Sequence, residues 1–356
     1  MIKKNKILYV VLFMSLFLWL FPDKSFADES SNLGYTVSAV LNGKQIDPEK
    51  SYFYIQTVPE EEQLLKVKVK STQKEPIKLK LYTTDAFTGD SGTIEYTENK
   101  KMLDTTLHDP ISKIVTVETP SLTVENFEEK EAVFKLTPPS ENYKGVKMGA
   151  LVFEVDGEES EEQVSSKFSY RIGLITSETG DDYKDSKTLN LIDAKSTLKR
   201  GKKMILTTLQ NPEPKMISNL EIVADVKAKD SETILKKKKV ENYMMAPNSH
   251  FDFEMDWGTG TVRAGTYIVT MSANDGYSDW KFEKEFTITS DQAKSMNENS
   301  GFRIITPTWI KIVTILILVV IGIIIVMILV RKKNMEIEWK RRREKRKKKR
   351  NQNKKI

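Results

Sequence analysis

Nineteen consecutive uncharged residues, Ile312–Val330, are the feature that most constrains this chain. At about 1.5 Å of rise per helical residue, such a run reaches about 28 Å, close to the thickness of a bilayer's hydrocarbon core. Lipid offers no hydrogen-bond partner to an unpaired backbone amide, so a run that crosses it must be helical. Trp309 stands just before the run, where an interfacial anchor is expected. We therefore predict a single transmembrane helix over residues 308–330.

The segment that follows is strongly basic. Residues 331–356 hold fifteen Lys or Arg against three Glu, the excess that marks a cytoplasmic side. This predicts a basic cytoplasmic tail, with everything upstream of the helix outside the cell. The basic side chains from Lys340 to Arg350 also suit anionic lipids, although the topological role is enough to account for them.

Charge on the predicted extracellular part argues against nucleic acid as a partner. Residues 28–307 carry 36 basic and 46 acidic side chains, a net charge of −10, so the +6 of the whole chain averages two compartments. A nucleic-acid-binding domain needs a basic patch on its folded part. We expect none here.

The amino terminus has the organisation of a secretory signal. Lys3, Lys4 and Lys6 precede the apolar run Ile7–Phe21, and Ser25–Ala27 offers small residues for cleavage. We predict a signal peptide over residues 1–27. The alternative is an uncleaved anchor, but fifteen apolar residues are short for a membrane span.

Cysteine is absent and histidine is scarce. With no thiol, the chain has neither disulfides nor thiolate metal sites, which for an exported protein suggests bacterial secretion. The two histidines, His108 and His250, lie in no zinc or catalytic-triad motif. We expect no metal and no cofactor.

Alternation with a period of two recurs along the predicted extracellular part. Leu65, Val67 and Val69 alternate with lysines, and Phe251–Trp257 places four large apolar residues opposite three carboxylates. Frequent turn residues and no convincing helical stripe (Gln292–Asn299 is short and polar) complete the pattern. The fold class predicted is all-β, with two tandem immunoglobulin-like β-sandwich domains followed by the transmembrane helix.

An acidic run, Glu158–Gln163, marks the boundary between these domains. Six polar residues with several like charges do not contribute to a core. We place the first domain at 28–156, an acidic linker at 157–163, the second domain at 164–290 and a juxtamembrane linker at 291–307. A long acidic hairpin within one sheet is the alternative.

A series of short motifs runs through both predicted domains. They are Asp47-Pro48, Ser51–Phe53, Val58-Pro59, Asp85–Thr88, Gly92–Tyr96, Tyr143–Gly145 and Gly149–Phe153 in the first domain, and Tyr170–Gly173, Asn211-Pro212, Met245–Ser249, Ala264–Tyr267 and Trp280–Ile288 in the second. Their order resembles the WxL-interacting protein family of Gram-positive bacteria over nearly the whole chain. One departure is visible, because Asn42–Gln45 stands where the family usually has a Pro-x-Asn-Gln turn.

The resemblance implies a cell-surface adaptor. Its first domain would bind peptidoglycan, and its second would bind WxL-domain surface proteins and also host components. The mature chain has no Trp-x-Leu sequence of its own, so it would hold such proteins without being one. It also lacks a Leu-Pro-x-Thr-Gly sorting signal before the span and would therefore stay in the cell membrane.

Two segments are the candidate sites. A glycan site needs aromatic faces and polar groups for hydroxyls, which suggests Asp85, Phe87, Thr88, Glu95 and Tyr96 for peptidoglycan. For a partner protein the candidates are Asn248, Ser249, Asp252, Glu254 and Asp256. The competing interpretations are a hairpin whose aromatic residues simply pack and a strand whose apolar residues form core.

Other functions remain in view. Lys236–Lys239 suits acidic polymers but is equally typical of a solvated strand edge. An adhesin that binds host extracellular matrix proteins directly is the main alternative to the adaptor. A wall glycosidase would need a carboxylate pair, and the strand alternation already accounts for most acids, so we expect a protein that is not an enzyme.

Overall fold

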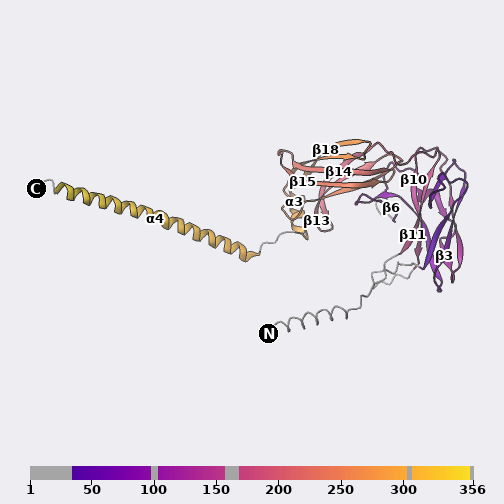
Figure 1. Ribbon diagram of the computed structural model, residues 1–356, viewed down its shortest axis with the longest axis horizontal. Coiled ribbons are helices and arrows are strands. Elements are labelled where there is room, and N and C mark those ends of the chain that lie inside the picture. Colours follow the sequence, from indigo (N-terminus) through magenta and orange to yellow (C-terminus); the bar gives the residue numbers. More distant parts are fainter. Residues whose placement is uncertain (1–33, 98–102, 157–167, 303–306, 353–356) are drawn as a thin grey trace, which may run out of the picture. The chain divides into compact units, whose positions relative to one another are not determined.

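The computed structural model describes residues 34–97, 103–156, 168–302 and 307–352. The predicted signal peptide (1–27) and the acidic segment 157–163 lie outside the described residues. Within them the chain is mostly β-strand, in several sheets, with one long apolar helix at the carboxyl end (Figure 1). The predicted fold class is thus confirmed at this level, and the immunoglobulin-like topology stays a prediction.

The first module, residues 34–177, is built from two sheets. One has the order β1-β3-β9-β7 and the other β2-β11-β10-β4-β8, with every neighbouring pair antiparallel except β2 and β11. The strands are β1 (Tyr35–Val40), β2 (Phe53–Gln56), β3 (Gln63–Ser71), β4 (Ile77–Asp85), β7 (Val115–Val117), β8 (Ser121–Val124), β9 (Glu129–Leu136), β10 (Lys147–Val155) and β11 (Ser169–Ser177).

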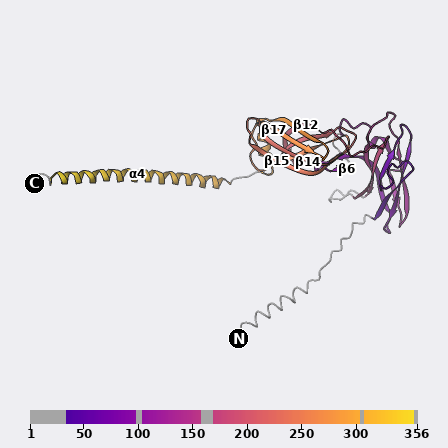
Figure 2. The ribbon, with the colours of Figure 1, turned by 45° about the horizontal axis from the view of Figure 1, so that its top comes forward.

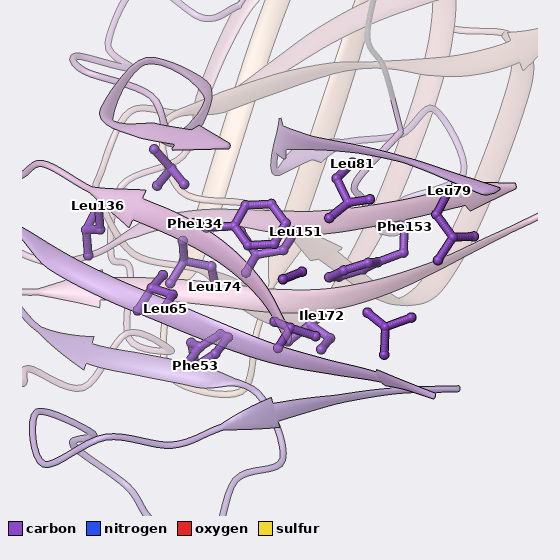
Figure 3. Packing of buried hydrophobic residues seen from close by; sticks show 14 of the residues in the cluster. Phe53, Leu65, Leu79, Leu81, Phe134, Leu136, Leu151, Phe153, Ile172 and Leu174 are labelled. Atoms are coloured by element: carbon purple, nitrogen blue, oxygen red, sulfur yellow. The ribbon is translucent and has the colours of Figure 1, made fainter. Parts of the chain in front are cut away.

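The core of this module lies between the two sheets. Figure 3 shows side chains from β3 and β9 pointing toward those from β4, β10 and β11. Leu65, Val67 and Val69 are fully buried while the lysines between them are exposed, as the alternation predicts. Each large apolar side chain buried in this way contributes roughly 1.5–3 kcal/mol.

Tyr35 closes one end of this core with a polar contact. Its hydroxyl donates to the Phe153 carbonyl oxygen at 2.6 Å, and its ring meets Tyr170 edge-on at 5.1 Å. Burial raises the pKa of Tyr35 to about 12.

Strand β11 pairs with β10 on one side and with β2 on the other, so it completes a sheet of the first module. The predicted domains, 28–156 and 164–290, would place this strand in the second one. The boundary between the domains stays a prediction, because strand pairing assigns β11 to a sheet and does not divide the chain into domains.

Two short elements, a hairpin and a helix, lie between β4 and β7 in the chain. Strands β5 (Phe87–Thr88) and β6 (Ile94–Glu95) form a small antiparallel hairpin directly after β4. Helix α2 (Ile111–Ile114) buries Ile111 and Ile114 against the core.

The second module, residues 190–288, also has two sheets. Their orders are β12-β13-β16 and β15-β14-β17-β18. Phe251, Phe253 and Met255 of β16 are at most 2% exposed, which confirms that they are core. The strands are β12 (Asn190–Lys199), β13 (Lys202–Asn211), β14 (Ile217–Ala228), β15 (Ile234–Met245), β16 (Ser249–Asp256), β17 (Gly265–Asn274) and β18 (Asp279–Ile288).

A separate compact unit contains residues 198–203, 257–263, 290–302 and 307–352, so the end of β12 and the start of β13 belong to it. It includes helix α3 (Ser290–Asn299), within the stretch predicted as a juxtamembrane linker. Ala293 and Met296 are buried, and the Asn297 side chain exchanges two hydrogen bonds with the backbone of Val262, at 2.8 and 2.9 Å. The sequence did not predict this helix, because its composition is polar and only two apolar side chains form its packed face.

Helix α4 (Thr308–Gln352) is continuous in both views (Figure 1, Figure 2). Its apolar part reaches a mean hydropathy of 3.6 and is long enough to cross a membrane. The helix continues through most of the predicted basic tail, since Lys, Arg and Glu are good helix formers and Glu338 pairs with Arg342 one turn later at 3.7 Å.

Candidate functional site

The two predicted binding segments contact each other. The Thr88 hydroxyl of hairpin β5–β6 lies 2.6 Å from the Ser249 hydroxyl of the second module and accepts a hydrogen bond from the Ala246 backbone N–H at 3.0 Å. The Met244 N–H donates to the Gly92 carbonyl oxygen at 2.8 Å. We call this contact region between the modules the seam.

At two glycines, the backbone of the first module lies very close to the second module. Gly92 and Gly145 both have positive φ, of 73° and 70°. A Cβ at Gly92 would overlap the Tyr243 ring, and one at Gly145 would overlap Pro214. The neighbouring Val146 N–H donates to the Pro214 carbonyl oxygen at 2.8 Å. The chain therefore uses glycine where a side chain would hold the modules apart.

An apolar cluster lies beneath these polar contacts. Residues of both modules form it, so separating the modules would expose its apolar surface to water. Such exposure costs about 25 cal/mol per Å². Its buried members are Tyr54, Ala86, Val146, Met148 and Ile175 of the first module and Met216 and Ala246 of the second.

The predicted peptidoglycan residues are largely engaged in packing and local contacts. Thr88 is 2% exposed, and Phe87 and Glu95 are half-buried. The Asp85 carboxylate accepts hydrogen bonds from the Ser112 N–H and hydroxyl, at 2.9 and 2.5 Å, at the start of α2. Tyr96 packs against the seam cluster, and burial raises its pKa. Their role in glycan binding stays a prediction, and substituting Asp85 or Tyr96 would also disturb structure.

The predicted partner residues divide into two groups. Asn248 and Ser249 are 8% and 4% exposed, with the Asn248 side chain donating to the Pro212 carbonyl oxygen at 2.8 Å. Asn248 also adopts a left-handed φ of 47°, which asparagine tolerates better than most residues. Asp252 and Glu254 on β16 are half-buried, and Asp256 is exposed. Of these five residues only Asp256 is exposed, and the binding role of all five stays a prediction.

Sequence reasoning missed a buried carboxylate at the seam. The Asp104 side chain, 2% exposed, accepts hydrogen bonds from the Thr106 N–H (2.9 Å) and hydroxyl (2.7 Å) in its own loop. From the second module it contacts Gln210 Nε2 at 3.0 Å and His250 Nδ1 at 2.7 Å. Burial alone would raise the pKa of Asp104, but the hydrogen bonds from Thr106, Gln210 and His250 outweigh it and hold the pKa below its ordinary value.

The lysine run lies on the edge strand β15. Lys237 pairs with Asp225 at 3.4 Å, and Lys239 pairs with Glu221 at 3.2 Å. Lys238 turns inward, with Nζ 2.7 Å from the Glu254 carbonyl oxygen and 4.7 Å from the Phe253 ring centre, and burial lowers its pKa. These contacts support the interpretation as a charged strand edge over that of a polymer-binding patch.

Two β-sheet modules joined by a buried seam precede a helix that is long and apolar enough to cross a membrane. The fold is thus that of a modular β protein with a helix that could anchor it in a membrane. Comparison with models of protein families identifies the family of this chain. A model described as WxL Interacting Protein, peptidoglycan binding domain, matches residues 35–155, and one described as its host binding domain matches residues 159–298. The chain belongs to the WxL-interacting protein family. These matches divide the chain where the acidic run does, whereas strand pairing places β11 with the first module.

Solved structures with similarity to this chain include several chaperones. The YadV chaperone is 11% identical, with 71% of this chain and 100% of that chain covered and a TM-score of 0.27. The chaperone DraB of E. coli is 12% identical, with coverages of 62% and 89% and a TM-score of 0.25. The CupB2 chaperone of Pseudomonas aeruginosa is 12% identical, with 63% and 91% covered and a TM-score of 0.24. The comparison with curated proteins finds no match.

Proposed function

We propose that this protein is a membrane-anchored adaptor of the Gram-positive cell surface, which binds peptidoglycan through its first module and tethers WxL-domain proteins through its second. The observation that carries the proposal is the seam between the two modules that the family models name. A load on the second module passes to the first through buried side chains and backbone hydrogen bonds. A tether between two binding partners needs such a connection.

The second candidate function is an adhesin. The matching model of residues 159–298 is described as a host binding domain, which favours direct binding of host matrix proteins by the second module. Both functions share the same anchored architecture and differ only in the partner. We further propose that the protein is not an enzyme and acts by binding.

Co-sedimentation tests the adaptor. Full-length protein in detergent is mixed with purified peptidoglycan and a WxL-domain protein, and the pellet is analysed. We expect the WxL-domain protein to pellet with the wall only when the full-length chain is present. A WxL-domain protein that stays in the supernatant, while a host matrix protein pellets in its place, would favour the adhesin. Release of soluble wall fragments would contradict the non-enzymatic proposal.

The proposed topology places both modules outside the cell and the end of α4 inside. Positive charge after the apolar segment supports this orientation. Protease added to intact, wall-stripped cells is expected to remove the modules and leave a membrane-bound fragment containing residues from about 308 onward, detected by a carboxyl-terminal tag. Protection of the modules, with loss of the tag, would reverse the topology.

A further inference from the structure

A polar concavity lies at one end of the second module, away from the predicted site residues in sequence. Its volume is about 780 Å³, within the roughly 300–1,000 Å³ of typical ligand sites. The connector from β11 to β12 (residues 178–189), the start of β14 and the turn between β17 and β18 border it. It is lined among others by Asp182, Lys187, Ser218, Asn219, Tyr277 and Ser278.

The connector that forms one wall is held in place by its backbone. The Met216 N–H donates to the Tyr183 carbonyl oxygen at 2.6 Å, and the Ser186 N–H donates to that of Met216 at 3.2 Å. The Lys187 carbonyl oxygen accepts the indole N–H of Trp280 at 3.1 Å. A wall fixed at three successive points is formed before any ligand arrives, which lowers the entropic cost of binding.

The opposite wall is a structured turn that displays an aromatic ring. The Asp275 carboxylate, 9% exposed as a residue, accepts the backbone N–H groups of Tyr277 at 2.9 Å and Ser278 at 2.7 Å. The Asn274 side chain accepts the Gly276 N–H at 2.8 Å. Within this ordered turn, Tyr277 is 96% exposed. The ordered turn thus places the ring at the rim of the concavity, where it is exposed to solvent and does not pack against the module.

The side chains that line the concavity determine which ligand fits. They comprise three Asp, two Lys, three Ser, one Asn and one Tyr, and among the described residues none that lines it is aliphatic. An anion would meet three carboxylates. Hydroxyl groups both donate and accept, so they match a mixture of carboxylate, ammonium, amide and hydroxyl partners. An exposed phenol ring matches the apolar C–H face of a sugar.

We propose that this concavity is a carbohydrate site that binds a neutral oligosaccharide, with Tyr277 stacking on one sugar ring and Asp182, Lys187 and Asn219 contacting its hydroxyls. The proposal goes beyond the adaptor function, because it gives the second module a ligand other than protein. A wall glycan and a host glycan share this chemistry, and the experiment distinguishes the two sources.

The test uses the full-length protein in a detergent without a sugar headgroup, with binding measured by calorimetry. The two probes are chitotetraose, which carries wall-type N-acetylglucosamine, and lacto-N-neotetraose, a galactose-containing tetrasaccharide of the host type. We expect saturable binding of at least one. Replacement of Tyr277 with alanine should weaken it about tenfold, which corresponds to about 1.4 kcal/mol, whereas Tyr277→Phe should keep the affinity within about twofold because the ring remains.

Further variants separate the site from general effects. Asn219→Asp keeps a residue that tolerates the left-handed φ of 54° while removing two amide donors, and should also weaken binding. Phe127→Ala removes an exposed aromatic side chain of the first module and should change nothing. Binding of chitotetraose alone assigns the site to wall glycans, and binding of lacto-N-neotetraose alone assigns it to host glycans.

Two outcomes would overturn the carbohydrate site: no saturable binding of either sugar, or binding that Tyr277→Ala leaves unchanged, which would locate the sugar elsewhere on the chain. Co-sedimentation of a WxL-domain protein with peptidoglycan, measured on the same Tyr277→Ala variant, is expected to stay at the wild-type level. Failure of the carbohydrate site is therefore distinguishable from failure of the adaptor.

Discussion

Replacement of Phe153 with alanine is expected to lower the free energy of unfolding of the first module by about 3–5 kcal/mol. Phe153 is fully buried on β10, between β4 and β11, and its ring meets Phe134 of the opposite sheet at 5.7 Å. Strand β10 is hydrogen-bonded to a neighbouring strand on each side, so its backbone cannot move to fill the space that the ring leaves. The cost therefore includes the cavity as well as the lost apolar burial.

Two spectroscopic signals make this prediction measurable module by module. No tryptophan lies between residues 34 and 177, so intrinsic tryptophan fluorescence reports the rest of the chain, whereas circular dichroism reports both modules. We expect the variant's circular-dichroism midpoint to fall by about 10–20 °C. The matched control is Phe127→Ala in the same module, because Phe127 is 55% exposed. Equal midpoints for the two variants would mean that Phe153 does not pack as described.

The alternation of residue types was enough to predict the strands and their buried faces. In β3 and β16 each apolar residue named from the sequence is buried, because a strand with one face in water and one on the core must alternate. The long apolar helix near the carboxyl end was equally predictable, since nineteen consecutive uncharged residues are rare outside membrane-spanning segments. These features are encoded within a single segment, where its own pattern specifies them.

The seam could not be predicted from the sequence in the same way. Thr88 and Ser249 are 161 residues apart, and Asp104 and His250 are 146 apart, so no local spacing relates them. Polar residues beside turns suggest solvent and ligands when only one segment is considered. In the structure the second module covers Thr88, and the hydroxyl pair satisfies groups that would otherwise be buried without partners.

The boundary between the modules shows a related limit. Residues 158–163 mark a hydrated segment, but composition does not reveal which sheet receives the strand that follows. Ile172 and Leu174 of β11 face the first core, and Ile175, on the other face, joins the seam cluster. A strand with apolar residues on both faces can serve either module, and pairing with β10 and β2 decides the assignment.

Replacement of Asp104 with alanine is expected to loosen the seam while leaving each module folded. The carboxylate is the acceptor shared by Thr106 of the first module and by Gln210 and His250 of the second. Its removal leaves partly buried donors without their acceptor, at a cost of about 1–3 kcal/mol. We expect the circular-dichroism and fluorescence transitions to coincide in the wild type and to separate in the variant. Limited proteolysis should cut the variant faster between the modules.

The matched control is Asp109→Asn, which removes a surface charge but keeps a residue that tolerates the left-handed φ of 47° at this position. Asp109 lies in the same loop and pairs with Lys113 at 2.6 Å, but this is a surface pair, so its loss should cost no more than about 0.5 kcal/mol. If Asp109→Asn separates the transitions as strongly as Asp104→Ala, the seam does not depend on the buried carboxylate.

Acid should reproduce the Asp104 effect in the unaltered protein. The pKa of Asp104 is lowered in the folded state from its ordinary value of 3.8. Its contribution to stability is therefore complete above the unfolded-state pKa and is lost as the pH falls through the folded-state pKa. The difference in unfolding free energy between wild type and Asp104→Ala should shrink as the pH falls below about 4. In a His250→Gln background the same decline should persist, because Thr106 and Gln210 still hold the carboxylate. A difference that grows as the pH falls below about 4 would contradict the proposed hydrogen bonding of the ionised Asp104.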